Sequence, residues 1–424
     1  MSNEILIPYC ATICFALAIL HTFSVKFFQS MAGKYKEGTV GENFFHLLGE
    51  VEVVFGLWAG LFVIIFMSLD GFRNSISYLE SRNFTEPLFV FVIMTVCATK
   101  PILVLTEKII NFFSQLIPGS KSLRFYIATL VIGPLLGSLI TEPAAMTVTA
   151  FILLNSFFNK SVSDRFRYAT LGLLFVNVSI GGTLTPFAAP PVLMVAAKWN
   201  WDLAYMLTHF GWKALVAIAV STVSVALFFR SEIGKVNIHS DLKKKSLPMP
   251  LWVVAIHLLI LAGIVGSSHY SVLFFGLFLL FLGVATVTKE YQTDLKIREA
   301  LLVGFFLAGL VVLGGLQSWW LQPMITGLSA GTLYLGAAAL TAVTDNAALT
   351  YLGSQVANLG EFSKYVLVAG SVVGGGLTVI ANAPNPAGYS ILNSSFGPQG
   401  ISAKSLLLGA LIPTLISGIC FWFL

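Results

Sequence analysis

Long apolar runs alternate with short polar stretches along almost the whole chain. A helix of about 20 apolar residues is long enough to cross a bilayer. Runs that fit a simple span lie at about 5–25, 45–69, 87–106, 210–229, 250–267, 271–288, 300–318 and 404–424. No stretch remains for a sizeable soluble domain. The pattern therefore predicts an all-α polytopic membrane protein.

Four further apolar runs are interrupted by residues that break helices. Two of them hold an acidic residue: 125–155 contains Gly133-Pro134, Gly137 and Thr141-Glu142-Pro143, and 325–358 contains Thr344-Asp345-Asn346. The other two, at about 169–197 and 365–390, are broken by glycines and prolines. Irregular backbone at membrane depth is tolerated only where protein or a water-filled cavity surrounds it. We expect the acidic runs to be re-entrant hairpins and the other two to be broken helices.

The interrupted runs also form an internal repeat. Residues 141–147 read Thr-Glu-Pro-Ala-Ala-Met-Thr, and residues 344–350 read Thr-Asp-Asn-Ala-Ala-Leu-Thr. One run later, Gly-Thr-Leu-Thr at 182–185 matches Gly-Gly-Leu-Thr at 375–378. Either match alone could be chance, but two in the same order predict two related halves. Each half would hold three spans, a hairpin, a broken helix and a closing helix.

Charge decides the topology of these halves. The chain is 57% hydrophobic and 10% charged, whereas soluble domains are about 25% charged. If 125–155 is a hairpin and the N-terminus lies outside, the basic loop residues between Lys26 and Arg298 fall on the inner side, except Arg73, Arg82 and Lys198. Because cytoplasmic loops are rich in Lys and Arg, this arrangement is favoured. It predicts a protein of the cell inner (plasma) membrane, with inverted repeats at 1–229 and 250–424 joined by a cytoplasmic linker at 230–249.

Glu142 and Asp345 are the candidate functional residues, because an ionised carboxylate inside a membrane needs a cation, a proton or hydrogen bonds to compensate it. Carboxylate, hydroxyl and carbonyl oxygens suit a hard cation, so we expect Na⁺ at Glu142 and Asp345. The alternative is that each carboxylate caps the following helix. For the Gly/Thr/Pro breaks, the alternative is helix packing through small residues. The predicted ion-binding set is Glu142, Asp345, Asn346, Thr141, Thr344, Thr185, Thr378, Gly182, Gly375 and Asn382.

A second group of charged residues lies in the predicted second and third spans. Glu50 and Glu52 project to different faces of a helix, and Lys100 could pair with one of them. A scaffold ion pair and a proton relay are equally good interpretations. We found no phosphate loop, nucleophile motif or zinc-ligand spacing, which argues against an ATP-driven enzyme. Nor does the charge balance indicate nucleic-acid binding, and no cofactor is expected beyond transported Na⁺ and H⁺.

The repeated acidic motif and the Gly-Thr-Leu-Thr-Pro break at 182–186 resemble the ion transporter superfamily, which includes NhaD-type sodium/proton antiporters and divalent-anion/sodium symporters. More narrowly, residues 46–52 (His-Leu-Leu-Gly-Glu-Val-Glu) and 139–147 resemble a bacterial sodium/proton antiporter family. The resemblance implies a homodimer of protomers, each with a scaffold and a transport domain that moves as an elevator. The symporters carry Ser-Asn-Thr at their hairpin tips. The present motifs depart from this pattern, and Asp345-Asn346 is closer to the Asp-Asn of NhaD-type proteins.

These observations favour exchange of sodium or lithium for protons. Two acidic side chains beside the cavity would repel a di- or tricarboxylate substrate, whereas they would hold a cation. Once the cation leaves, burial would favour protonation of the two carboxylates. On this hypothesis, Asp345→Asn abolishes sodium-dependent pH changes in everted vesicles. The alternative is a sodium-coupled symporter of an organic or inorganic anion, in which both carboxylates only bind sodium.

Overall fold

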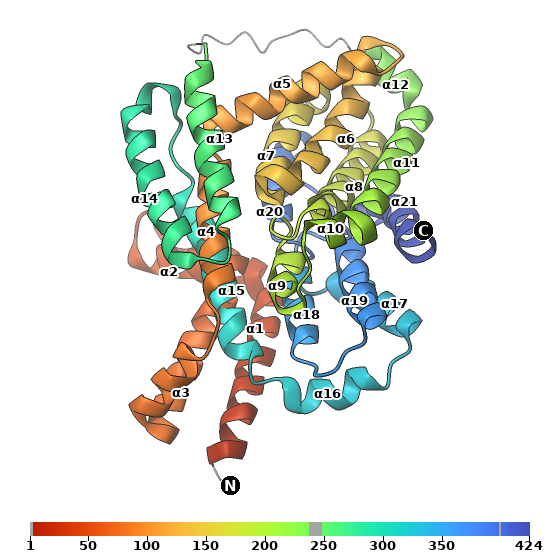
Figure 1. The fold of residues 1–424 in the computed structure, drawn as a ribbon. Coiled ribbons are helices and arrows are strands. Elements are labelled where there is room, and N and C mark those ends of the chain that lie inside the picture. The colour runs from red at the N-terminus through yellow and green to blue at the C-terminus, as the bar shows by residue number, and fades with distance from the viewer. Residues whose placement is uncertain (1–2, 237–247, 398–399) are drawn as a thin grey trace. The chain divides into compact units, whose positions relative to one another are not determined.

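The computed structural model describes residues 3–236, 248–397 and 400–424, and these residues form helices joined by turns, with no β-strand among them (Figure 1). Unit 1 comprises Met1–Phe91, Ile297–Ser329 and Tyr351–Lys364. Unit 2 comprises Val92–Lys296, Ala330–Thr350 and Tyr365–Leu424. Each unit thus combines segments from both predicted repeats.

Unit 1 is built around two long helices, α3 and α15, that pack on each other and on α1. Close packing is possible because Gly309 has no side chain: a Cβ there would lie 2.4 Å from the backbone of Phe55. The helices of this unit are α1 (Asn3–Ala32), α2 (Val40–Leu48), α3 (Val51–Glu80), the first part of α4 (Thr85–Cys97), α15 (Ile297–Gly314), α16 (Ser318–Thr326), the end of α18 (Asn346–Ser354) and the start of α19 (Glu361–Gly374).

Unit 2 holds both acidic motifs and both Gly/Thr/Pro breaks. Its first helices are the end of α4, α5 (Lys100–Leu116), α6 (Lys121–Ile140), α7 (Glu142–Leu153), α8 (Asp164–Gly181), α9 (Pro190–Trp199), α10 (Leu203–Met206), α11 (Trp212–Phe228) and α12 (Arg230–Lys235). After these come α13 (Leu251–Gly266), α14 (Ser271–Val287), α17 (Ala330–Thr341), the start of α18, most of α19 (Glu361–Gly374), α20 (Asn385–Leu392) and α21 (Ala403–Phe423). Short π-helices, Leu154–Phe158 and Leu207–Gly211, continue α7 and α10.

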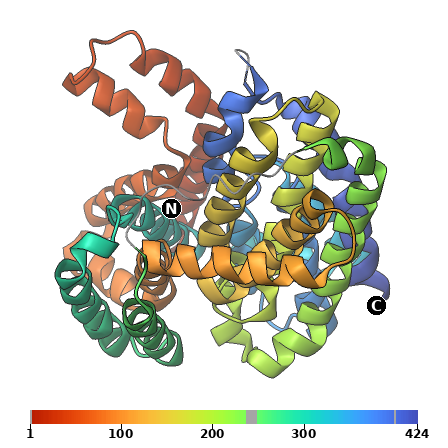
Figure 2. The same cartoon turned by 90° about the horizontal axis from the view of Figure 1, so that it is seen from above.

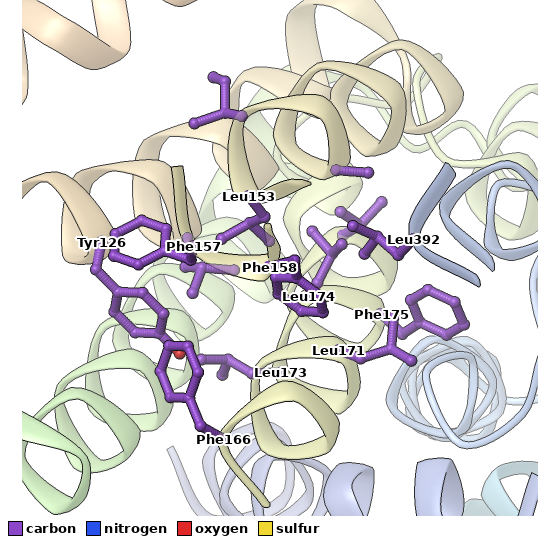
Figure 3. Packing of buried hydrophobic residues seen from close by; sticks show 14 of the residues in the cluster. Tyr126, Leu153, Phe157, Phe158, Phe166, Leu171, Leu173, Leu174, Phe175 and Leu392 are labelled. Atoms are coloured by element: carbon purple, nitrogen blue, oxygen red, sulfur yellow. The ribbon is translucent and has the colours of Figure 1, made fainter. Parts of the chain in front are cut away.

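A hydrophobic core in unit 2 supports the α6–α7 pair (Figure 3). Tyr126 of α6, Phe157 of the π-helix after α7 and Phe166 of α8 are fully buried and contact one another through their rings. Leu392 of α20 belongs to the same cluster. In a membrane protein, close van der Waals packing of such side chains contributes to the association of helices. The core therefore holds α6, α7, α8 and α20 together.

The helices confirm a multi-pass membrane protein. Among the described residues, six helices are long and apolar enough to cross a membrane, or seven if the bent pair α4–α5 forms one span. Shorter apolar helices cover Glu142–Phe158, Leu251–Gly266, Ser271–Val287 and Ala330–Thr341. The expected spans at 250–267 and 271–288 thus correspond to α13 and α14.

The expectation of one simple span at 87–106 is wrong. The helix stops at Cys97 and restarts at Lys100, with a bend of 70° between α4 and α5. Pro101 lies in the first turn of α5, a position where the missing N–H costs no hydrogen bond and where proline favours a new helix start. Figure 2 shows α5 (orange) lying lengthwise across the view from above.

The first interrupted run also breaks at fewer places than expected. Helix α6 continues through Gly133-Pro134 and Gly137 and ends only at Ile140. Its glycines serve packing: a Cβ at Gly133 would lie 2.4 Å from Oγ1 of Thr149 in α7, and one at Gly137 would lie 3.3 Å from Cβ of Ala145. They therefore let α7 lie closely along α6.

The second interrupted run is also shorter than 325–358. Residues 325 and 326 belong to α16, the helices of the run begin only at Ala330, and α18 ends at Ser354. Of the expected linker at 230–249, the start forms α12, whereas 237–247 lie outside the described residues. The inverted relation of the repeats and the re-entrant course of the hairpins stay predictions.

Candidate functional site

A single residue, Thr141, joins α6 to α7. Its φ of 71° is positive, which is rare for a β-branched residue and costs about 1–3 kcal/mol. The backbone turns here without a glycine, and Glu142 and Pro143 immediately begin α7. Glu142 is thus placed at a helix N-terminus, where the helix dipole favours a negative charge.

The side chain of Glu142 is fully buried. Its Oε2 accepts a hydrogen bond of 2.9 Å from Nδ2 of Asn382, which lies in the break between α19 and α20. Its Oε1 is buried and has no hydrogen-bond partner. A Cβ on Gly182, in the break after α8, would lie 2.5 Å from this Oε1. The structure thus brings together Glu142, Asn382 and Gly182, three of the predicted residues.

Asp345 has a different environment. It is only partly buried, and its Oδ1 accepts hydrogen bonds from the backbone N–H groups of Ala347 (2.8 Å) and Ala348 (3.2 Å). These contacts cap the N-terminus of α18, which is the alternative considered for both carboxylates. Asp345 still lies close enough to Glu142 to act on it electrostatically. Both carboxylates therefore belong to one region of unit 2.

Asn346 connects the second acidic motif to the neighbouring break. Its backbone N–H donates to the carbonyl of Ala381 over 3.1 Å. Its side chain is fully buried, and neither Oδ1 nor Nδ2 has a hydrogen-bond partner. A Cβ on Gly375 would lie 2.9 Å from this Nδ2. An unpaired buried amide costs free energy, so Asn346 offers unused hydrogen-bonding and ligand capacity.

The four predicted threonines divide into two groups. Thr185, Thr378 and Thr344 donate their hydroxyl hydrogens to backbone carbonyls, at 2.7, 2.8 and 2.9 Å respectively. Thr141 is buried, and its Oγ1 has no partner. Thr185 and Thr378 therefore help to hold the two breaks in place, the Thr344 bond is a local contact within its own segment, and Thr141 has an unpaired hydroxyl.

Nearly the whole chain matches a known protein family. The profile of a family described as "Putative Na+/H+ antiporter" matches residues 6–424. The chain belongs to this Na⁺/H⁺ antiporter family. A comparison with curated proteins gives no match. Since the family profile covers residues 6–424, both acidic motifs and both breaks lie inside the matched region.

Ser138 is a site residue that the sequence did not single out. Its Oγ donates to the carbonyl of Gly181 (2.7 Å) and accepts from the N–H of Leu184 (2.9 Å), and its carbonyl accepts from Thr185. Ser138 of α6 thus fastens the first break beside Glu142. Its only signal in the sequence was its position, three residues before Thr141 in a run already expected to hold the hairpin.

Asn385 fastens the second break in a similar way. Its Nδ2 donates to the carbonyls of Gly375 (2.7 Å) and Thr378 (2.8 Å). These bonds close the irregular segment between α19 and α20, from which Asn382 projects. The prolines on either side of Asn385 drew attention to this segment, but only the fold identifies the carbonyls that it binds.

The second predicted group, Glu50, Glu52 and Lys100, is divided between the two units. Glu50 pairs with Arg298, with 2.6 Å between Oε1 and Nη2, which was not among the partners considered. Both residues belong to unit 1. Glu52 lies in the first turn of α3, and Lys100 begins α5 in unit 2. A proton-relay role for the three stays a prediction.

Proposed function

We propose that this chain exchanges sodium or lithium ions for protons, and that Glu142 is the group that binds either ion. One observation carries the proposal: a fully buried carboxylate whose Oε1 has no hydrogen-bond partner. Membership of the Na⁺/H⁺ antiporter family supports the same reaction.

The chemistry follows from the cost of burying charge. An ionised carboxylate at this depth needs compensation beyond the single hydrogen bond from Asn382. A cation at Oε1 supplies it directly, and a proton supplies it by neutralising the group. Since one atom cannot hold both, cation and proton exclude each other at Glu142, and this competition couples their movement.

Neutral oxygens complete the proposed site. Among the described residues, no three His, Cys, Asp or Glu side chains gather as a metal-binding group. A sodium ion at Glu142 would then use uncharged ligands, which hard cations accept. Oγ1 of Thr141 and Oδ1 of Asn346 are buried and unpaired, and Asp345 adds negative charge nearby. We propose these residues as the remainder of the ion-binding set.

Alternating access is proposed to occur by movement of unit 2 as a transport domain. Support comes from the distribution of the site: Glu142, Asp345, Asn346 and Asn382 all belong to unit 2. A body that carries its whole site can move without taking the site apart. Re-entrant hairpins, a homodimer built on unit 1, an outside N-terminus and an inner-membrane location belong to this proposal.

The test uses purified protein in proteoliposomes with an imposed proton gradient. Addition of sodium or lithium should dissipate the gradient for the native chain, and potassium should have little effect. Glu142→Gln, which keeps the shape but cannot ionise, should lower the rate at least about 100-fold. Unchanged exchange in Glu142→Gln would refute the assignment. Sodium uptake that requires an anion and leaves the proton gradient intact would establish a symporter instead.

A further inference from the structure

A proline inside α6 removes the usual partner of one backbone carbonyl. In an α-helix the N–H of residue 134 would donate to the carbonyl of residue 130, but proline has no N–H. Helix α6 nevertheless continues through Pro134. The carbonyl of Leu130 accepts instead from Nδ2 of Asn177 in α8 (2.9 Å) and from Oγ1 of Thr222 in α11 (3.4 Å). Two side chains thus replace a bond that the backbone cannot make.

Asn177 is the stronger of these two donors. It is fully buried, as is Thr222. Its Nδ2 donates one hydrogen to the carbonyl of Leu130 and the other to Oγ1 of Thr222 (2.9 Å), so both hydrogens of the amide are used. Without Asn177, the carbonyl would keep only the longer bond from Thr222. Because a poorly satisfied buried carbonyl costs free energy, Asn177 stabilises α6 at the point where Pro134 weakens it.

The contacts between α6 and the segment around the first break recur every four residues with one sequence separation of 47 positions. They pair Leu130 with Asn177, Pro134 with Gly181, and Ser138 with Thr185. The middle pair is a close approach, since a Cβ at Gly181 would lie 2.5 Å from the carbonyl oxygen of Pro134. The two segments therefore run in the same direction in one register, and Asn177 makes the first contact of the series.

This series of contacts ends beside Glu142. Helix α6 ends at Ile140, and Glu142 begins α7 after the single residue Thr141. On the other segment, Gly182 follows Gly181 directly, and a Cβ at Gly182 would lie 2.5 Å from Oε1 of Glu142. The course of α6 past Pro134 therefore determines how much space remains beside Oε1, where the proposed cation binds.

Asn177 itself lies outside the proposed cation site. It precedes Gly182 by five positions, which corresponds to about 7.5 Å along a helix axis. Its side chain tilts toward the helix N-terminus and thus away from Gly182. Oxygen ligands lie about 2.3–2.6 Å from a hard cation. Oδ1 of Asn177 is buried and has no hydrogen-bond partner, but it is too far from Gly182 and Oε1 of Glu142 to bind the same cation.

We propose that Asn177 is a positioning residue for cation binding: it replaces the bond that Pro134 removes and thereby fixes the course of α6 toward Glu142. This inference rests on the proposed function. Prolines inside helices produce kinks, and a kink at Pro134 would displace the end of α6 relative to Gly182. An N–H at position 134 would satisfy the carbonyl of Leu130 and make Asn177 dispensable.

The experiment measures the apparent KM for sodium and for lithium, together with the maximal exchange rate, in proteoliposomes at a fixed pH. Asn177→Ala should raise the apparent KM for sodium about tenfold, because a displaced carboxylate no longer fits the ion. The ratio of the sodium and lithium KM values should also change, since the two ions differ in size. A variant that only lowers the amount of folded protein would reduce the maximal rate and leave both KM values unchanged.

The decisive variant combines Asn177→Ala with Pro134→Ala, which supplies the missing N–H and keeps the Cβ. In the Pro134→Ala background, Asn177→Ala should change the KM for sodium by less than about twofold. Pro413→Ala is the matched control. Pro413 also lies inside a helix of unit 2, α21, but its substitution supplies an N–H to a different carbonyl. The tenfold effect of Asn177→Ala should therefore persist in the Pro413→Ala background.

Two outcomes would overturn the proposal. Unchanged KM values in Asn177→Ala would exclude the positioning role, and an equal rise in the native and Pro134→Ala backgrounds would exclude the link to the freed carbonyl. If Asn177→Ala does not fold, Thr222→Val removes the longer bond to the same carbonyl. It should raise the KM for sodium about threefold, and only while Pro134 is present; an unchanged KM in Thr222→Val would again overturn the proposal.

Failure of the proposed function gives a different result. If the native chain does not exchange cations for protons, the proposed function is refuted. The coupling between positions 134 and 177 is then measured from the free energies of unfolding of the native chain, the two single variants and the double variant. Additive losses in that cycle would overturn the replacement of the Pro134 bond by Asn177, whatever the chain transports.

Discussion

The two acidic motifs of unit 2 have nearly the same sequence but different environments. Glu142 is fully buried, follows a residue with positive φ, and keeps one unpaired oxygen. Asp345 is partly exposed, and its Oδ1 caps α18. Matched positions in a repeat therefore do not imply matched functions. On this ground we propose that ion exchange takes place mainly at Glu142, with Asp345 in a supporting electrostatic role.

The largest expected effect lies on the Glu142 side. Gly182→Ala would place a Cβ 2.5 Å from Oε1 and 2.6 Å from Cγ of Glu142, which forces the carboxylate to move. A displacement of about 1 Å can lower a rate about 100-fold, so the rate of exchange in Gly182→Ala should fall about 100-fold. The proteoliposome assay measures it. The control Gly336→Ala adds a Cβ with no atom within 4 Å, and equal loss in both variants would contradict this explanation.

A smaller effect is expected on the Asp345 side. Asparagine caps a helix nearly as well as aspartate, so Asp345→Asn removes the charge and keeps the cap. We expect at most about a tenfold rise in the apparent KM for sodium, equivalent to about 1.4 kcal/mol. This expectation replaces the complete loss that the repeat alone suggested.

Asp345→Ala removes both charge and cap, and it should also lower the free energy of unfolding by about 1 kcal/mol. Thermal unfolding in detergent and the transport assay separate the two contributions. If Asp345→Asn abolished exchange as completely as Glu142→Gln, the two carboxylates would have equal roles in ion binding, as the sequence repeat suggests.

The smallest effect concerns the hydrogen bonds that close the two breaks. Ser138→Ala removes two side-chain bonds in the first break, whereas Thr378→Val removes one in the second. At about 1 kcal/mol for each bond, the first variant should lose about twice as much unfolding free energy. Chemical denaturation of the purified protein tests the ratio. Equal losses of unfolding free energy in the two variants would show that the side-chain hydrogen bonds stabilise the two breaks equally.

Much of the fold could be predicted because lipid imposes simple constraints. Apolar runs of span length located α13, α14 and α21 to within a residue or two. The bend between Cys97 and Lys100 was missed, since an unbroken apolar run conceals a helix restart that depends on a proline. At Gly133-Pro134 the sequence predicted a break that the helix does not have. The glycine there serves close packing against α7, which the sequence cannot show.

The sequence could name candidate site residues, but it could not show which of them contact one another. Two short motifs located Glu142 and Asn382 separately, although they lie 240 positions apart and meet in the fold. Which atom of Asn382 faces the carboxylate depends on how α19 and α20 are joined. The capping role of Asp345 depends on whether its χ angles turn it toward the helix start, and a repeat in sequence carries no such information.

The one-residue joint at Thr141 also has a consequence for chain length. Each residue added to an α-helix rotates the next part of the chain by about 100° and moves it by about 1.5 Å. With no loop between Ile140 and Glu142 to absorb an insertion, one extra residue would turn the carboxylate away from Asn382 or force α7 out of register with α6. The number of residues before Glu142 is therefore as much a part of the site as their chemical nature.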